Sequence, residues 1–136
     1  TGIQHSTFND RSNQIPYYYS RVDSGNSTEA FNTIKGFFRL NYLINTYTFG
    51  IIINDDSYIK SDCRKGDLLI VNKVQIPKNN DIILVKKELY KNLMIFVVEE
   101  GKNYLIELSS NKSTNKHEYN ESYYIIGVVA AKIRNY

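Results

Sequence analysis

The chain has 136 residues, of which 42% are hydrophobic and 23% charged. These are ordinary values for a folded domain, so they exclude global disorder and a fibrous repeat and predict one globular unit with a hydrophobic core. The net charge is only +3, and basic and acidic residues alternate along most of the chain, which argues against nucleic-acid binding by this segment alone.

The cysteine and histidine content bears on compartment and on metal binding. The single cysteine, Cys63, excludes an intrachain disulfide framework and a cysteine-based zinc site, and it fits a reducing cytoplasm. The two histidines, His5 and His117, lie in polar segments without ligand-type spacing, so we expect no metal and no other cofactor. No apolar run approaches the roughly 20 residues of a membrane-spanning helix, and we expect a soluble cytoplasmic protein without a membrane partner.

The N-terminal part of the chain changes character at residue 15. Residues 1–14 are polar and lack an apolar period, which indicates a linker or the cut edge of a longer chain, and the domain itself is expected over 15–136. It opens with the extended segment IPYYY. Residues 28–44 mix weak helical spacing with aromatic and β-branched residues, which predicts a short helix or turn leading into a strand.

The rest of the chain consists of short β-branched runs separated by turn residues. At this length such runs favour strands over helices. The last of them contains Gly127, which indicates a bulge or tight curvature. The fold is therefore predicted to be mostly β. The expected strands lie in TYTFGIIIN, DLLIVNKVQI, DIILVKK, NLMIFVVEE, YLIELSS and YYIIGVVAAKIRNY, with a hairpin joining NLMIFVVEE to YLIELSS.

Ser57 lies in a polar turn between two of these runs, in the stretch IINDDSY followed by KGDLLIVNK. Asp55, Asp56 and Asp62 lie in the same turn, but they lack the spacing of a calcium loop and are expected to shape the turn instead. The stretch resembles the Val-x-Gly-Asp-Ser-Met and Gly-Asp-x-x-hydrophobic-Val motifs of the C-terminal domains of LexA and phage CI-type repressors. The resemblance continues in order from the Ile15-Pro16 strand to the final strand at Arg134.

Members of that family are self-cleaving serine-lysine peptidases that follow a helix-turn-helix DNA-binding domain. The resemblance implies strongly curved antiparallel sheets with an N-terminal arm, Ser57 at the nucleophile position, and Ser24-Gly25 at the position of the bond that the family cuts. It places the lysine that would act as base on Phe96, and a phenylalanine cannot accept a proton. Lys91 is a weak substitute, since its parity along a strand is opposite to that of Phe96.

The resemblance therefore implies an oligomerisation and regulatory domain of a phage-type or mobile-element transcriptional repressor that does not cleave itself. The alternatives are a slow self-cleaving serine protease domain and a sensor domain that binds an antirepressor or a peptide. DNA would be reached only through a preceding domain, and the expected partner is a second copy of the chain. The final strand, which we expect to offer an unprotected edge, supplies the candidate dimer-interface residues Ile126, Val128, Ala130, Lys132 and Arg134.

Overall fold

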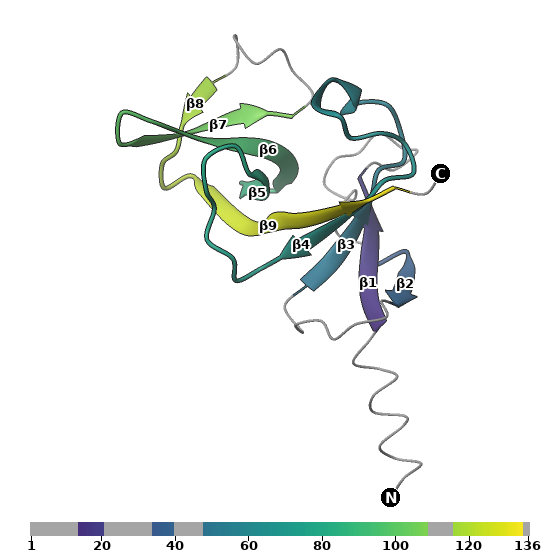
Figure 1. The fold of residues 1–136 in the computed structure, drawn as a ribbon. Coiled ribbons are helices and arrows are strands. Elements are labelled where there is room, and N and C mark those ends of the chain that lie inside the picture. Colours follow the sequence, from purple (N-terminus) through teal and green to yellow (C-terminus); the bar gives the residue numbers. More distant parts are fainter. Residues whose placement is uncertain (1–13, 21–33, 40–47, 109–115, 135–136) are drawn as a thin grey trace, which may run out of the picture.

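The computed structural model describes residues 14–20, 34–39, 48–108 and 116–134. In these residues, nine strands form one sheet in the order β2-β1-β3-β4-β9-β5-β6-β7-β8 (Figure 1). The strands are β1 (Gln14–Tyr19), β2 (Gly36–Arg39), β3 (Thr48–Ile52), β4 (Leu68–Asn72), β5 (Ile82–Lys87), β6 (Tyr90–Glu99), β7 (Lys102–Glu107), β8 (Lys116–Glu118) and β9 (Tyr123–Ile133). The prediction of a mostly β fold is confirmed.

The sheet is mixed, because one strand pair departs from the expected antiparallel arrangement. β1 runs parallel to β3, whereas the other neighbouring strands are antiparallel. A parallel pair needs a long connection, and β1 and β3 are separated by residues 20–47. The expected N-terminal arm is thus a strand of the sheet itself, and Gln14, the last residue of the expected linker, is its first residue.

Several predicted boundaries also shift. The run 67–76 ends as a strand at Asn72, whose side-chain Oδ1 accepts a hydrogen bond from the N–H of Val74 at 2.9 Å and so forms a turn. β8 lies in a segment that the sequence predicts as a polar loop. Of the expected helix or turn at 28–44, the structure describes only residues 34–39, which include the strand β2; the remainder lies outside the described residues.

β9 crosses the middle of the sheet and bends it. Its first half pairs with β5 and its second half with β4, and the register shifts between Leu84 and Val85 on one side and between Ile70 and Val71 on the other. Gly127 lies at this crossing, where an added Cβ would come within 2.6 Å of Val71 Cγ1 and 2.9 Å of the Asn72 carbonyl oxygen. The irregularity expected at Gly127 is confirmed as a register shift beside it, and the close approach of β4 leaves no room for a side chain there.

The hydrophobic core consists of two clusters that use alternate residues of β5 and β6. Because successive side chains of a strand point to opposite faces, neighbouring residues such as Leu93 and Met94 enter different clusters. The buried members of the first cluster are Phe49, Ile51, Ile53, Cys63, Leu69, Val71, Leu84, Leu93 and Leu108. Those of the second cluster are Ile83, Val85, Met94, Phe96, Leu105 and Val128.

The described residues form no α-helix, and their one helical element is the short 3-10 turn η1 (Ile59–Ser61). In that part of the chain no helix is long and apolar enough to cross a membrane.

Candidate functional site: the Ser57 turn

Ser57 lies in the connection between β3 and β4, and hydrogen bonds close this connection at its base. The N–H of Ile53 donates to the Asp67 carbonyl oxygen at 2.9 Å, and the N–H of Gly66 donates to the Ile53 carbonyl oxygen at 2.6 Å. Gly66 has φ +96°, a conformation that costs glycine little because it has no Cβ. The two strands therefore hold residues 54–65 as one closed turn, the Ser57 turn.

The Ser57 turn is ordered by its own polar side chains. Asp55 Oδ1 accepts a hydrogen bond from the N–H of Ser57 at 3.1 Å, as an aspartate does at the start of a turn. Asp62 adopts φ 58° and its N–H donates to the Ile59 carbonyl oxygen, which ends η1. Tyr58 packs against the first cluster, and Ser61 Oγ donates to the Leu108 carbonyl oxygen at 2.5 Å. The expectation that aspartates shape this turn holds for Asp55 and Asp62.

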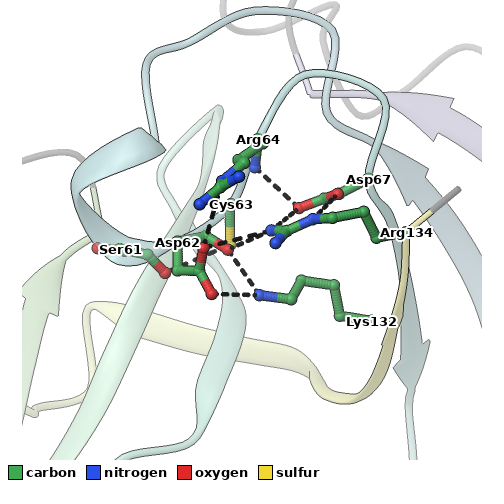
Figure 2. Close-up of polar contacts among 7 residues, drawn as sticks. All are labelled: Ser61, Asp62, Cys63, Arg64, Asp67, Lys132 and Arg134. Atoms are coloured by element: carbon green, nitrogen blue, oxygen red, sulfur yellow. Dashed lines mark hydrogen bonds and ion pairs between the residues drawn. The ribbon is translucent and has the colours of Figure 1, made fainter. Parts of the chain in front are cut away.

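Five charged residues then fix the end of the turn to β9; we call them the Asp67 network, and they are Asp62, Arg64, Asp67, Lys132 and Arg134 (Figure 2). The Asp67 side chain is 1% exposed. Arg134 Nε and Nη2 donate to its two carboxylate oxygens at 2.8 and 2.7 Å, and the Arg64 N–H donates to Oδ2 at 2.8 Å. A buried carboxylate is stable only when it is paired in this way.

The second carboxylate of the network is exposed. Lys132 Nζ lies 2.6 Å from the Asp62 carbonyl oxygen and 3.2 Å from its carboxylate. Arg134 Nη2 also donates to the Asp62 carbonyl oxygen, at 3.1 Å. These bonds use the backbone of the left-handed Asp62, so they hold the conformation that ends η1.

The electrostatics follow from this geometry. The hydrogen bond from Arg134 lowers the pKa of Asp67 below 3.8 against the opposing effect of its burial, and the Arg64 N–H adds to the lowering. The hydrogen bond from Lys132 is the main cause that lowers the pKa of Asp62. Burial raises the pKa of the Cys63 thiol above 9.0. Cys63 is therefore a core residue in its neutral form, not an activated nucleophile.

Phe96, the residue at the expected lysine position, is buried and 6% exposed. It belongs to the second cluster, whereas the Ser57 turn packs through Tyr58 against the first. The residues of β6 that contribute to the first cluster are Leu93 and Ile95. The face of β6 that supports the Ser57 turn is therefore not the face that carries Phe96.

Lys91 has the same strand parity as Leu93 and Ile95, so it lies on the face of the first cluster. Lys91 and Phe96 do lie on opposite faces of β6, as expected, but it is Lys91 that lies on the face toward the Ser57 turn. Lys91 is half-buried, and burial, followed by the nearby charge of Lys86, lowers the pKa of its ammonium group below 10.5. A lowered pKa is what a lysine base requires.

The cleavage-site-like pair Ser24-Gly25 lies outside the described residues, but Ser20, four residues before Ser24, is described. At the end of β1, Ser20 donates its N–H to the Ile52 carbonyl oxygen at 2.9 Å. Its hydroxyl donates to Asn54 Oδ1 at 3.0 Å and accepts the Asn54 N–H at 3.3 Å. β1 therefore delivers the chain beside the Ser57 turn, four residues before Ser24.

The dimer-interface candidates lie in several different environments. Val128 is fully buried, and Ile126 packs against the first cluster. Lys132 and Arg134 bind the Ser57 turn, so of the five candidates Ala130 is the one that is exposed without a part in that network. The expectation of an unprotected final strand is wrong for β9 as a whole, because β4 and β5 flank it.

One half of β9 nevertheless has a strand neighbour on one side only among the described residues. Within the described residues its pairing with β5 ends at Val128, so residues 129–133 pair with β4 alone.

The sequence did not reveal the Asp67 network. Asp67 and Arg134 are separated by 67 positions, and no local spacing indicates such a pair. The signal that the sequence does contain is the Gly-Asp pair at 66–67, because an aspartate directly before a buried strand needs a cation as partner. Among the described residues, no group of three or more His, Cys, Asp and Glu side chains is placed to hold a metal ion.

The mostly β fold, with a serine-bearing turn closed between two adjacent strands, is consistent with the peptidase-like β domains that the motifs resemble. The family model described as Peptidase S24-like matches residues 16–130, most of the chain. The chain belongs to this family, which contains the C-terminal domains of LexA and CI-type repressors, so the resemblance is confirmed. A search of curated proteins finds no match.

Proposed function

We propose that this chain is the self-association and regulatory domain of a phage-type or mobile-element transcriptional repressor, that it acts in the cytoplasm, and that it does not cleave itself. Family membership supports the repressor role, since an S24-like domain is compatible with a regulatory or a self-cleaving module. The observation that carries the loss of cleavage is the apolar stretch of β6 around the expected lysine position. Phe96 occupies that position, and Leu93 and Ile95, on the face that supports the Ser57 turn, are apolar as well, so none of the three can accept a proton.

Self-association has a physical motive in such a protein. A helix-turn-helix monomer makes few base contacts, and joining two copies raises their effective concentration on a palindromic operator. The surface that supports the proposal is the side of residues 129–133 of β9 that faces away from β4, which we call the half-edge. Ala130 and Ala131 are exposed there. Among the described residues no strand other than β4 pairs with residues 129–133, so a strand of a second copy would find backbone groups to pair with there.

Sedimentation of the chain without DNA tests self-association. At tens of micromolar we expect a dimer or a larger oligomer, and Ala130→Asp should shift it toward monomer because it places a charge on the half-edge. Asn103→Asp adds the same charge at an exposed position of β7 and should leave the oligomer intact. Val128→Asp is unsuitable, since Val128 is fully buried and the change would unfold the domain. A wild-type chain that sediments only as monomer contradicts the proposal.

Mass spectrometry after long incubation at alkaline pH tests the loss of cleavage. High pH promotes self-cleavage only where a basic nitrogen beside the serine can lose its proton. We expect an intact chain, identical to that of Ser57→Ala. A fragment that begins at Gly25 and is missing from Ser57→Ala would restore the protease.

Slow self-cleavage is the second candidate function, and Lys91 is the observation that favours it. This half-buried lysine lies on the face of β6 that supports the Ser57 turn, and its pKa is lowered. If the Gly25 fragment forms, Lys91→Gln should abolish it. Lys102→Gln removes an exposed lysine from the β6–β7 hairpin and should leave the fragment unchanged.

A further inference from the structure

An open depression of about 470 Å³ lies across β6, β5 and β9, at the end of these strands next to the β5–β6 turn. It is lined by Lys86, Glu88, Lys91, Ser122, Tyr124 and Ile126. The strand register explains why these residues meet. Lys86 is directly opposite Lys91 on one side and Tyr124 on the other, so the three side chains form a row across adjacent strands.

The row holds two like charges face to face. Lysines directly opposite each other on neighbouring strands repel and destabilise the pair. The repulsion is felt at Lys91, where burial and then the charge of Lys86 lower the pKa. An anion between the two ammonium groups would lower this repulsion, because both lysines are attracted to it.

The remaining lining determines what kind of anion fits. Glu88 contributes one negative charge to the depression, so the two lysines and this glutamate leave a single net positive charge. Tyr124 is 68% exposed, and Ile126 connects the depression to the first cluster. Leu89, 73% exposed, occupies the adjoining turn. Exposed apolar side chains with polar groups around them are typical of protein-binding surfaces.

The geometry points to a docking site for an acidic peptide segment of a partner protein, in which one carboxylate lies between Lys86 and Lys91 and an adjacent apolar side chain packs against Tyr124. The inference gives the proposed regulatory domain a partner of defined chemistry, and it rests on that role. Its test involves neither DNA, self-association nor cleavage, so its failure can be told apart from failure of the proposed function.

The test uses the full chain and a capped tetrapeptide, acetyl-Gly-Glu-Phe-Gly-amide, with the Gln counterpart as control. Nuclear magnetic resonance should show shifts concentrated at Lys86, Lys91 and residues 122–126. The pKa of Lys91 should rise on binding, because the carboxylate stabilises its charged form.

The variants give the quantitative readout. We expect Lys86→Gln and Lys91→Gln each to weaken binding by about tenfold, as the loss of a charge-assisted hydrogen bond does. Lys102→Gln removes an exposed lysine elsewhere and should leave the affinity unchanged. Tyr124→Ala should weaken the Glu-Phe peptide but not a Glu-Gly peptide.

Three results would overturn the inference. The first is equal binding of the Glu and Gln peptides. The second is the absence of shifts at the lysine row at millimolar peptide. The third is saturation by acetate at the same concentration as the peptide, which would identify a small-anion site without a peptide.

Discussion

The substitution Asp67→Asn measures how strongly β9 holds the Ser57 turn. The buried carboxylate accepts two hydrogen bonds from Arg134 and one from the Arg64 N–H. An asparagine keeps the shape but turns an NH₂ group toward one of these donors and removes the charge that Arg134 faces. Removing one partner of a buried ion pair costs ~3–5 kcal/mol, and hydrogen bonds to charged groups are worth ~1.5–3 kcal/mol each.

A cost below that of a fully buried ion pair applies here, because the Arg134 side chain is 19% exposed and keeps its contacts with Asp62 after the substitution. We expect Asp67→Asn to lower the free energy of unfolding by ~2–3 kcal/mol. Urea unfolding at neutral pH, followed by circular dichroism, measures this as a fall in the midpoint at constant slope. Asp56→Asn removes the same charge from an exposed position of the turn and should change stability by less than ~0.5 kcal/mol.

A double-mutant cycle with Arg134→Met isolates the Asp67–Arg134 pair, and residues in direct contact should give a coupling energy of at least ~1 kcal/mol.

The pH dependence of stability follows from the lowered pKa of Asp67. Between its folded pKa and ~3.9 the unfolded chain binds more protons, so the contribution is complete above ~pH 5 and is lost progressively as the pH falls to the folded value. Stability of Asp67→Asn within ~0.5 kcal/mol of the wild type, or a coupling near zero, would refute the role of the network.

Two further predictions concern the core. Gly127→Ala should lower the free energy of unfolding by ~2–3 kcal/mol in thermal or urea unfolding, because the alanine Cβ would meet the backbone of Asn72. Gly36→Ala, whose Cβ would meet only the Tyr17 ring, should cost less. Equal costs of the two substitutions would contradict this account. Cys63 should react with a thiol reagent at neutral pH only as fast as the domain opens, because it is fully buried and its thiol pKa is raised. Rapid labelling of the folded chain would show that the turn does not cover it.

Most of the strands, though not β8, could be predicted from the sequence, because short β-branched runs between turn residues favour strands over helices. The same holds for the serine-bearing turn, whose Gly-Asp motif and aspartates are local features. The family was also recognisable, and the matching family model over 16–130 confirms it. Each of these depends on residues that are neighbours in the sequence.

The tertiary structure alone decided which strands are neighbours and which faces meet. β9 follows β8 in the chain but lies between β4 and β5, so the final strand is central and most of its interface candidates are buried or bound to the Ser57 turn. The face shared by Lys91 and the Ser57 turn could not be predicted either. Alternation along a strand shows which residues share a face, but only the packing of distant segments shows which face lies beneath a given turn.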